Sequence, residues 1–385
     1  MSKAENKRLG DYIREVNVRN RELKVTNLLG VSISKEFMPS IANTIGTDMS
    51  TYKIVGRRQF AYGPVTSRNG DKVSIALLDG YDNAIISQAY TVFEVIDHEQ
   101  LLPEYLMMWF RRPEFDRYAR FHSHGSAREI FDWDELCDVM LPIPSITRQS
   151  EIVAEYETLT NRIRLNNQKI QHLEATAQAL YRKTFVENID KENLPEGWRM
   201  GTIDSICEVK DGTHDSPKPV DVGNPLITSV HLNSWSVSLQ SAYFISARNY
   251  SKINERSLVE TGDILMSMIG TIGVVSYVLY EQVDFAVKNM AIFKTSRNSK
   301  YAEYVLFNLK SNEMKQYIVE STSGSTQGYV TLNTLRCIPL IIPDECIIED
   351  FHSIAKELIS HIWNLTKENE ILTELQSLLL SKMGQ

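Results

Sequence analysis

Two long stretches of the chain repeat apolar residues at alternating steps of four and three. The first stretch runs from Ile152 to Leu180 and the second from Phe351 to Leu379. This spacing places one apolar stripe along an α-helix and is typical of helices that pack on another helix. The two stripes form a predicted interhelix seam that comprises Ile152, Tyr156, Leu159, Ile163, Asn166, Ile170, Leu173, Ala177 and Leu180 with Phe351, Ala355, Leu358, Ile362, Leu365, Asn369, Leu372, Gln376 and Leu379.

The two stripes predict an intramolecular coiled coil, because one chain supplies both helices. If the two halves of the chain are related by a pseudo-two-fold axis, the helices run antiparallel and hold one globular unit at either end of a rod of roughly 50 Å. Asn166 and Asn369 interrupt the seams with polar side chains. Each asparagine either fixes the register of the helices or lies at a solvated edge, and the pattern leaves both interpretations open.

Shorter runs of β-branched and aromatic residues alternate with turn residues outside these helices. They predict strands within residues 73–79, 91–96, 262–280 and 290–295. One helical segment is expected in each half, at about residues 103–120 and 302–319. The predicted fold class is α+β, with two mixed α/β domains separated by two long antiparallel coiled-coil helices. The pattern does not determine the order of the strands.

The chain repeats itself with a constant shift of 199 positions. Without a gap, this shift pairs Tyr105 with Tyr304 and Leu136 with Leu335, and Pro144 with Pro343 just before each long helix. A register held over about 80 residues predicts an internal duplication. The polar segment 188–203 separates the copies. The predicted domains are 1–147 (first globular unit), 148–190 (first long helix and linker), 191–343 (second globular unit) and 344–385 (second long helix).

The composition is that of a protein with buried cores, at 43% hydrophobic and 23% charged residues. No apolar run reaches the roughly 18 residues that a membrane-spanning helix needs, and we expect a cytoplasmic protein. Four cysteines without a CxxC pair predict reduced, buried thiols; they are Cys137, Cys207, Cys337 and Cys346. The net charge of −8 argues against a basic surface overall. Binding of a nucleic acid would therefore depend on the local field of one face.

A search for enzyme motifs gives little. The sequence has no GxxxxGK[ST] loop, no GxGxxG and no GxSxG. His122 and His124 form an HxH pair, but no further ligand lies nearby in the sequence, and ordinary loop histidines are the favoured interpretation. Glu208 and Lys210 form an ExK that resembles the core of metal-dependent nucleases, although a solvated strand end is favoured. We expect no catalytic residue, metal or cofactor in this chain.

Polar loops supply the candidate DNA-binding residues. In the first copy, basic and amide side chains surround Phe60 and Tyr62 and could reach phosphates and base edges; an ordinary charged turn is the alternative. Both copies place a Gly-Ser loop at the same position with different flanking residues, which favours two readers of different sequences. The candidates are Arg57, Arg58, Ser67, Arg68, Asn69, His122, His124, Ser126 and Arg128 in the first copy, and Lys210, His214, Lys218, Lys288, Asn289, Ser325, Thr326 and Gln327 in the second.

Over essentially its whole length the chain resembles the specificity subunits of type I restriction-modification systems. The resemblance rests on the duplicated layout and on four kinds of motif: DGTHDSP from Asp211, GDILMSMIGTIG from Gly262, STSGSTQGYVTLNTL from Ser321, and LPIPS and IPLIIP ahead of the two long helices. The pair DGTHDSP and MIGTIG is the most specific of these, whereas coiled-coil helices alone are not specific.

The resemblance implies a non-catalytic DNA reader. Each globular unit would be a target-recognition domain for one half of a split, asymmetric double-stranded DNA site. The helices would set the spacer and dock two methyltransferase subunits, which restriction/translocase subunits join. S-adenosylmethionine, ATP and magnesium would then belong to the partner subunits.

One departure from the family pattern concerns the start of the long helices. The family often has a glutamine there; Gln149 fits, but Ile348 occupies the aligned position. Equivalent partner contacts at the two helix starts are therefore in doubt. Two alternatives stay open, namely a DNA-independent coiled-coil scaffold and a stand-alone metal-dependent nuclease that uses Glu208 and Lys210.

Overall fold

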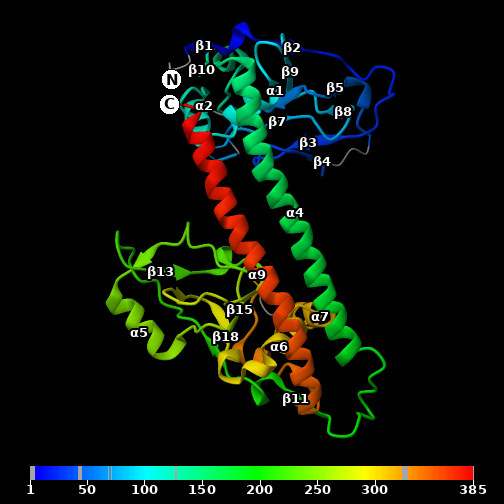
Figure 1. Cartoon of the computed structure of the whole chain (residues 1–385), viewed down its shortest axis with the longest axis vertical. Helices are drawn as coiled ribbons and strands as arrows, with labels where there is room; N and C mark the ends of the chain where they lie inside the picture. The colour runs from blue at the N-terminus through cyan, green and yellow to red at the C-terminus, as the bar shows by residue number, and fades with distance from the viewer. Residues whose placement is uncertain are drawn as a thin grey trace. The chain divides into compact units, whose positions relative to one another are not determined.

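The computed structural model forms two compact units and describes residues 5–41, 46–67, 69–70, 72–125, 128–322 and 328–384. Unit 1 comprises Met1–Ile163 with Ile371–Gln385, and unit 2 comprises Arg164–Glu370. The long helices α4 (Ile146–Phe185) and α9 (Glu345–Lys382) each contribute one part to either unit (Figure 1).

Unit 1 is built around a four-stranded antiparallel sheet. Its order is β2 (Ile13–Val16), β9 (Thr91–Val95), β6 (Phe60–Tyr62), β7 (Ile75–Leu77). Phe60 lies opposite Phe93, and their rings stack with centroids 4.7 Å apart. Around this core lie α1 (Pro103–Phe110), α2 (Pro113–Phe121), α3 (Trp133–Cys137), the pairs β1 (Asn6–Arg8) with β10 (Met140–Pro142), β3 (Leu29–Val31) with β4 (Phe37–Pro39) and β5 (Lys53–Gly56) with β8 (Asn83–Ile86), and the short 3-10 helices η1 (Leu9–Asp11) and η2 (Met49–Thr51).

Unit 2 contains a sheet with the same order. It runs β12 (Val209–Asp211), β18 (Met290–Phe293), β15 (Ile264–Ser267), β16 (Val275–Tyr277). A second sheet joins β14 (Phe244–Ile245), β13 (Asn224–Ile227) and β17 (Ala286–Val287), and β11 (Arg199–Thr202) pairs with β19 (Pro339–Ile342). The helices are α5 (Ala247–Ser257), α6 (Ala302–Leu309), α7 (Asn312–Glu320) and α8 (Leu332–Arg336), with the 3-10 helices η3 (Ile203–Ser205), η4 (Ser229–His231) and η5 (Thr295–Tyr301).

The duplication is confirmed by the positions at which the helices start. Helices α1, α2, α3 and α4 begin at residues 103, 113, 133 and 146, whereas α6, α7, α8 and α9 begin at 302, 312, 332 and 345. Each pair is separated by the shift of 199 that the sequence shows. The predicted α+β class and the strands at the four predicted runs are confirmed as well.

The single helix expected after each sheet is wrong, because two helices form there in either unit. In unit 1, Pro113 starts α2 and cannot continue α1, since proline lacks the N–H that a helix interior needs. In unit 2 the break falls at Ser311, whose side chain accepts a hydrogen bond from the backbone N–H of Met314 and so caps α7.

The long helices pack antiparallel within each unit. In unit 1, the Gln376 amide donates to the Thr160 hydroxyl at 2.7 Å. In unit 2, Asn166 lies beside Asn369, and Tyr181 lies beside Phe351 with ring centroids 6.3 Å apart. The antiparallel packing that the seams predicted is therefore confirmed, and every seam residue is buried or half-buried.

Asn166 forms a polar layer in this packing. Its side chain is 2% exposed and donates to Asn369 Oδ1 and Glu368 Oε2, both at 3.0 Å. Asn369 in turn donates to Asn167 Oδ1 at 2.8 Å. The solvated-edge interpretation is thus wrong for Asn166.

The expectation of buried cysteines holds for two of the four. All four are free, but Cys337 and Cys346 are exposed, so the expectation of burial is wrong for these two. Cys137 and Cys207 are buried, and burial raises the pKa of the Cys207 thiol to about 12. Among the described residues, no helix combines the length and the apolar composition that crossing a membrane requires.

Candidate nucleic-acid interface

Two polar loops of unit 1 lie side by side. Val65 and Ile130 form an antiparallel β-bridge, and the Phe131 N–H donates to the Pro64 carbonyl at 2.9 Å. Thr66 adds a bond from its N–H to the Glu129 carbonyl at 3.0 Å. The described parts of the loop after β6 and of the loop after α2 therefore form one surface, here called the unit 1 loop surface (residues 63–67, 69–70, 72–74, 122–125 and 128–131).

Several predicted DNA-binding residues meet on this surface. Ser67 and Arg128 are exposed, whereas Asn69 is half-buried and its amide donates to the Val65 carbonyl and the Ser74 hydroxyl. The Asn69 side chain thus stabilises the conformation of its own loop. The predicted residues Arg68 and Ser126 lie outside the described residues.

The HxH pair binds a carboxylate of its own unit. His122 Nδ1 lies 2.9 Å from one Glu135 oxygen, and His124 Nε2 lies 3.7 Å from the other. His122 also stacks on Tyr118, with ring centroids 4.2 Å apart. Glu135 thus orders both histidines at the edge of the loop surface.

Arg57 and Arg58 lie elsewhere in unit 1, in the turn before β6, whereas the loop surface follows that strand. Arg57 lies 3.8 Å from Asp79 and 3.7 Å from Asp82, and Arg58 bonds Glu104 at 2.9 Å. The structure therefore does not bring these arginines together with Ser67 and Asn69.

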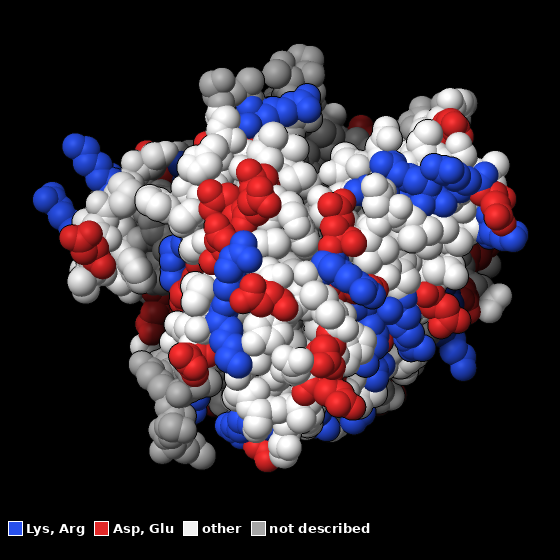
Figure 2. All heavy atoms as spheres, turned by 90° about the horizontal axis from the view of Figure 1, so that it is seen from above, with Lys and Arg blue, Asp and Glu red and all other residues white. Residues whose placement is uncertain are grey.

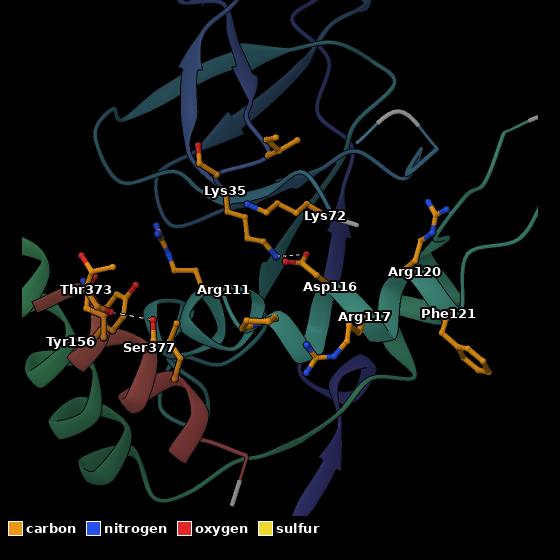
Figure 3. Close-up of a pocket in the computed structure, with 15 residues that line it drawn as sticks. Lys35, Lys72, Arg111, Asp116, Arg117, Arg120, Phe121, Tyr156, Thr373 and Ser377 are labelled. Atoms are coloured by element: carbon orange, nitrogen blue, oxygen red, sulfur yellow. Dashed lines mark hydrogen bonds and ion pairs between the residues drawn. The ribbon is translucent and has the colours of Figure 1, made fainter. Parts of the chain in front are cut away.

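The sequence did not predict a basic groove that lies next to the loop surface. It is lined by Lys35, Lys72, Arg111, Arg117 and Arg120 together with Asp116 (Figure 3). Arg120 belongs to both features, since it pairs with Glu129 at 2.8 Å and donates to the Gly70 carbonyl at 3.3 Å. The spacing of Arg117 and Arg120 on one helix hinted at a basic face, but nothing in the sequence linked it to Lys35.

Unit 2 joins the corresponding loops in the same way. Ile269 forms an antiparallel bridge with Tyr329, and the Val330 N–H donates to the Met268 carbonyl at 3.0 Å. Tyr329 and Val330 lie 199 positions after Ile130 and Phe131. The MIGTIG motif thus packs beside Tyr329 and Val330. The predicted residues Ser325, Thr326 and Gln327 lie outside the described residues.

A polar cluster in unit 2 centres on Asp211 of the DGTHDSP motif. Its carboxylate binds the Arg256 guanidinium and lies 3.1 Å from His214 Nε2, and His214 Nδ1 lies 2.9 Å from Asn289 Oδ1. Burial by itself raises the pKa of Asp211, but its bonds with Arg256 and His214 outweigh burial and the pKa is lowered. Lys288, the residue before Asn289, donates to the Ser216 hydroxyl. The structure therefore brings His214, Lys288 and Asn289 together.

Lys210 and Lys218 lie apart from this cluster. Successive strand residues face opposite sides, so Lys210 turns away from the Asp211 side chain and lies 3.5 Å from Glu208. Glu208 is also bound by Arg297. Lys218 is exposed in the loop that follows. Within the described parts of the chain, no group of three His, Cys, Asp or Glu side chains is placed to hold a metal ion.

Helix α5 adds a basic stripe to unit 2. Arg248, Lys252 and Arg256 are exposed and spaced four residues apart, so they lie on one face of the helix. Arg256 connects this stripe to the Asp211 cluster. No α-helix precedes α1 in the described part of unit 1, so the two units differ here.

Basic and acidic side chains alternate in small groups on the face seen in Figure 2. Neither sign dominates that face, although the whole chain carries a net charge of −8. Contact with a polyanion would therefore rest on local groups of cations such as the α5 stripe and the basic groove.

Gln149, in the first turn of α4, is buried in its own unit. It is 0% exposed, accepts a hydrogen bond from the Leu102 N–H at 2.9 Å, and donates to the Gln100 and Pro144 carbonyls at 2.8 and 2.9 Å. Ile348 at the matching position is also 0% exposed and lies in the apolar core. The difference between the two residues therefore concerns internal packing of the helix starts.

Comparison with known proteins identifies the family. The model of the type I restriction modification DNA specificity domain matches residues 5–175 and again residues 195–377. The MjaIX specificity subunit of Methanocaldococcus jannaschii is 24% identical over 75% of this chain and 70% of its own length. The HindI specificity subunit of Haemophilus influenzae is 20% identical over 97% of both chains.

A solved structure shares the fold. The S subunit of a type I restriction-modification system from M. genitalium superposes with a TM-score of 0.58 at 14% identity, over 99% of this chain and 96% of that one. Together with the family match, this confirms the resemblance that the motifs indicated. The chain belongs to the type I restriction modification DNA specificity domain family and carries that domain twice.

Proposed function

We propose that this chain is the DNA-reading specificity subunit of a type I restriction-modification system and is itself non-catalytic. Each unit reads one half of a bipartite double-stranded DNA site, and the α4 and α9 helices set the distance between the halves. These helices also dock two methyltransferase subunits, which restriction subunits join. S-adenosylmethionine, ATP and magnesium are bound by those partners.

The repeated scaffold with different polar surfaces is the observation that carries this proposal. The sheets of both units have the same strand order, and in both an equivalent bridge joins the loop after β6 or β15 to Ile130 or Tyr329. The polar groups differ, with His122, His124 and Arg128 in unit 1 against the Asp211 cluster and the α5 stripe in unit 2. Two readers of different sequences need this combination of equal scaffolds and unequal contacts.

A domain exchange tests the proposal. Residues 1–147 are replaced by those of a related specificity subunit, and the methylated positions in host DNA are mapped by single-molecule sequencing. We expect only one half of the methylated sequence to change. The matched exchange of residues 191–343 should change only the other half, and a change of both halves by either exchange would contradict the two-reader proposal.

Two further measurements separate the alternatives. A nuclease acting through Glu208 and Lys210 would cut DNA when the purified chain is given magnesium, and we expect no cleavage, since Arg297 and Lys210 already bind Glu208. A DNA-independent scaffold would show no salt-dependent affinity for duplex DNA in the assembled complex. We expect affinity that falls steeply with salt, because contacts to phosphates release counterions.

A further inference from the structure

The basic groove of unit 1 carries more positive charge than its own carboxylates neutralise. Its cavity of about 750 Å³ lies between α2, residues 33–35, Lys72 and the parts of α4 and α9 that belong to unit 1. Lys35, Lys72, Arg111, Arg117 and Arg120 line it, against the single carboxylate of Asp116 (Figure 3). Neighbouring cations that lack a carboxylate partner repel one another and favour an anionic ligand.

The carboxylate of Asp116 is already engaged. Lys35 is buried, donates to Asp116 at 2.6 Å and also bonds the Phe110 carbonyl. Burial lowers the pKa of Lys35, and the Asp116 carboxylate acts in the opposite direction. Arg111 and Lys72 lie near this pair, and among the described residues neither has an ion-pair partner. The side chains of Lys72 and Arg111 are therefore available to bind an anionic ligand.

The other cations of the groove have partners at its edge. Arg117 bonds Glu114 at 3.1 Å and Arg120 bonds Glu129 at 2.8 Å, and both arginines are exposed. Neutral polar groups from Tyr156, Thr373 and Ser377 line the opposite wall (Figure 3). Arginine and lysine with hydroxyl donors are the groups that bind phosphates in protein–DNA interfaces.

We propose that this groove binds backbone phosphodiesters of DNA and anchors unit 1 without reading the sequence. The proposal rests on the proposed function, because the DNA is the one that the loop surface reads. DNA is the ligand that fits best, because the groove is continuous with the loop surface. Lys72 lines the groove and lies in the loop after β6. Arg120 also lines the groove and donates to the Gly70 carbonyl in that loop.

Among the described residues, the unit 2 positions that match the groove's arginines form no equivalent group of available cations. At a shift of 199, Arg111, Arg117 and Arg120 correspond to Lys310, Gln316 and Val319. The Lys310 side chain is 10% exposed, lies 3.9 Å from the centroid of the Trp235 ring and bonds Glu174 at 2.7 Å, so its charge is neutralised within unit 2. Unit 2 places its exposed cations elsewhere, on α5, so the groove is a feature of unit 1.

The test measures affinity for a duplex carrying the methylated site, using the full chain in its assembled complex, between about 50 and 300 mM salt. Lys72→Ala and Arg111→Ala should each reduce the slope of log K against log salt by about 0.9, because each removes one cation that neutralises a phosphate. The methylated sequence should stay the same, because the groove contacts no base edge. Arg111→Lys keeps the charge and should restore the slope.

Two substitutions outside the groove serve as controls. Lys24→Ala, an exposed lysine outside the groove, and Gln316→Ala, the unit 2 counterpart of Arg117, should leave the slope unchanged. Unchanged slopes in the groove variants, or an altered methylated sequence, would overturn the anchor. Calorimetry with ATP alone covers the other source of phosphate, and ATP binding that disappears in Arg111→Ala would overturn the assignment to DNA. A wild-type complex without salt-dependent binding would instead refute the proposed function.

Discussion

At the residue scale, the side chains that matter most are those buried with their hydrogen bonds complete. Gln149 and Asn166 are both almost fully buried, and each bonds groups that are distant in the sequence. A buried polar group stabilises little when paired but costs about 1–3 kcal/mol when its partner is removed. Changes at such positions therefore act through the groups that they leave behind.

Gln149→Leu should destabilise unit 1 strongly. The substitution keeps the volume but leaves the Leu102 N–H and the Gln100 and Pro144 carbonyls unpaired. We expect the free energy of unfolding to fall by about 2–4 kcal/mol, as measured by urea unfolding of the full chain.

The neighbouring exposed position supplies the control for this prediction. Ser150→Ala should change the free energy of unfolding by less than about 0.5 kcal/mol, because Ser150 is exposed on α4. The matching change Ile348→Gln should also destabilise, since it places an amide in an apolar core. A Gln149→Leu protein as stable as the parent would mean that water replaces all three bonds.

At the scale of elements, the helix pair combines an apolar seam with one polar layer. The layer joins Asn166 to Asn369 and Glu368 within unit 2. Apolar neighbours in a seam tolerate several registers, whereas an asparagine pair is satisfied only when the two residues meet. The layer therefore selects one register of α4 against α9 at some cost in stability.

Replacement of this layer should separate stability from register. Asn166→Ala alone should lower the free energy of unfolding by about 1–3 kcal/mol, because it leaves Glu368 and Asn369 without this partner. The double change Asn166→Leu with Asn369→Leu should recover that loss, since matched apolar groups pack in the seam. Urea unfolding of Asn166→Leu, Asn369→Leu and the double variant forms a double-mutant cycle, and we expect a coupling of about 0.5–3 kcal/mol. Strictly additive losses would show that the observed bonds contribute nothing.

At the scale of the whole molecule, the two units share one scaffold but carry their exposed cations on different elements. Unit 1 has the basic groove beside its loop surface, and unit 2 has the α5 stripe beside the Asp211 cluster. Each surface gathers cations locally, which explains how a chain of net charge −8 can present local fields for a polyanion.

The contributions of the two units to DNA affinity should be independent. Lys72→Ala in unit 1 and Lys252→Ala in unit 2 remove cations that share no partner among the described residues. The binding penalties of the single variants should therefore add in the double variant within about 0.5 kcal/mol. Dissociation constants for the duplex site at one fixed salt concentration measure this. A penalty in the double variant well below the sum would show that the two cations act on one shared step.

The sequence by itself determined the repeat, the strands at four runs and the seam of the long helices. These features are local, because periodicities of 2 and 3.6 residues state which face of an element is apolar. The break between α1 and α2 was missed, although Pro113 was a local signal for it in unit 1. The family also followed from the sequence, since its motifs are contiguous.

The tertiary structure alone decided which polar groups act together. Lys35, Lys72 and Arg111 come from three separate segments of unit 1, and no periodicity relates them. It also separated Arg57 and Arg58 from the loop surface and gave His122 and His124 a carboxylate partner in Glu135. A charged side chain is neutralised or left available by neighbours that the fold brings from elsewhere. For this physical reason the sequence predicted the scaffold but did not predict which charged side chains are available to a ligand.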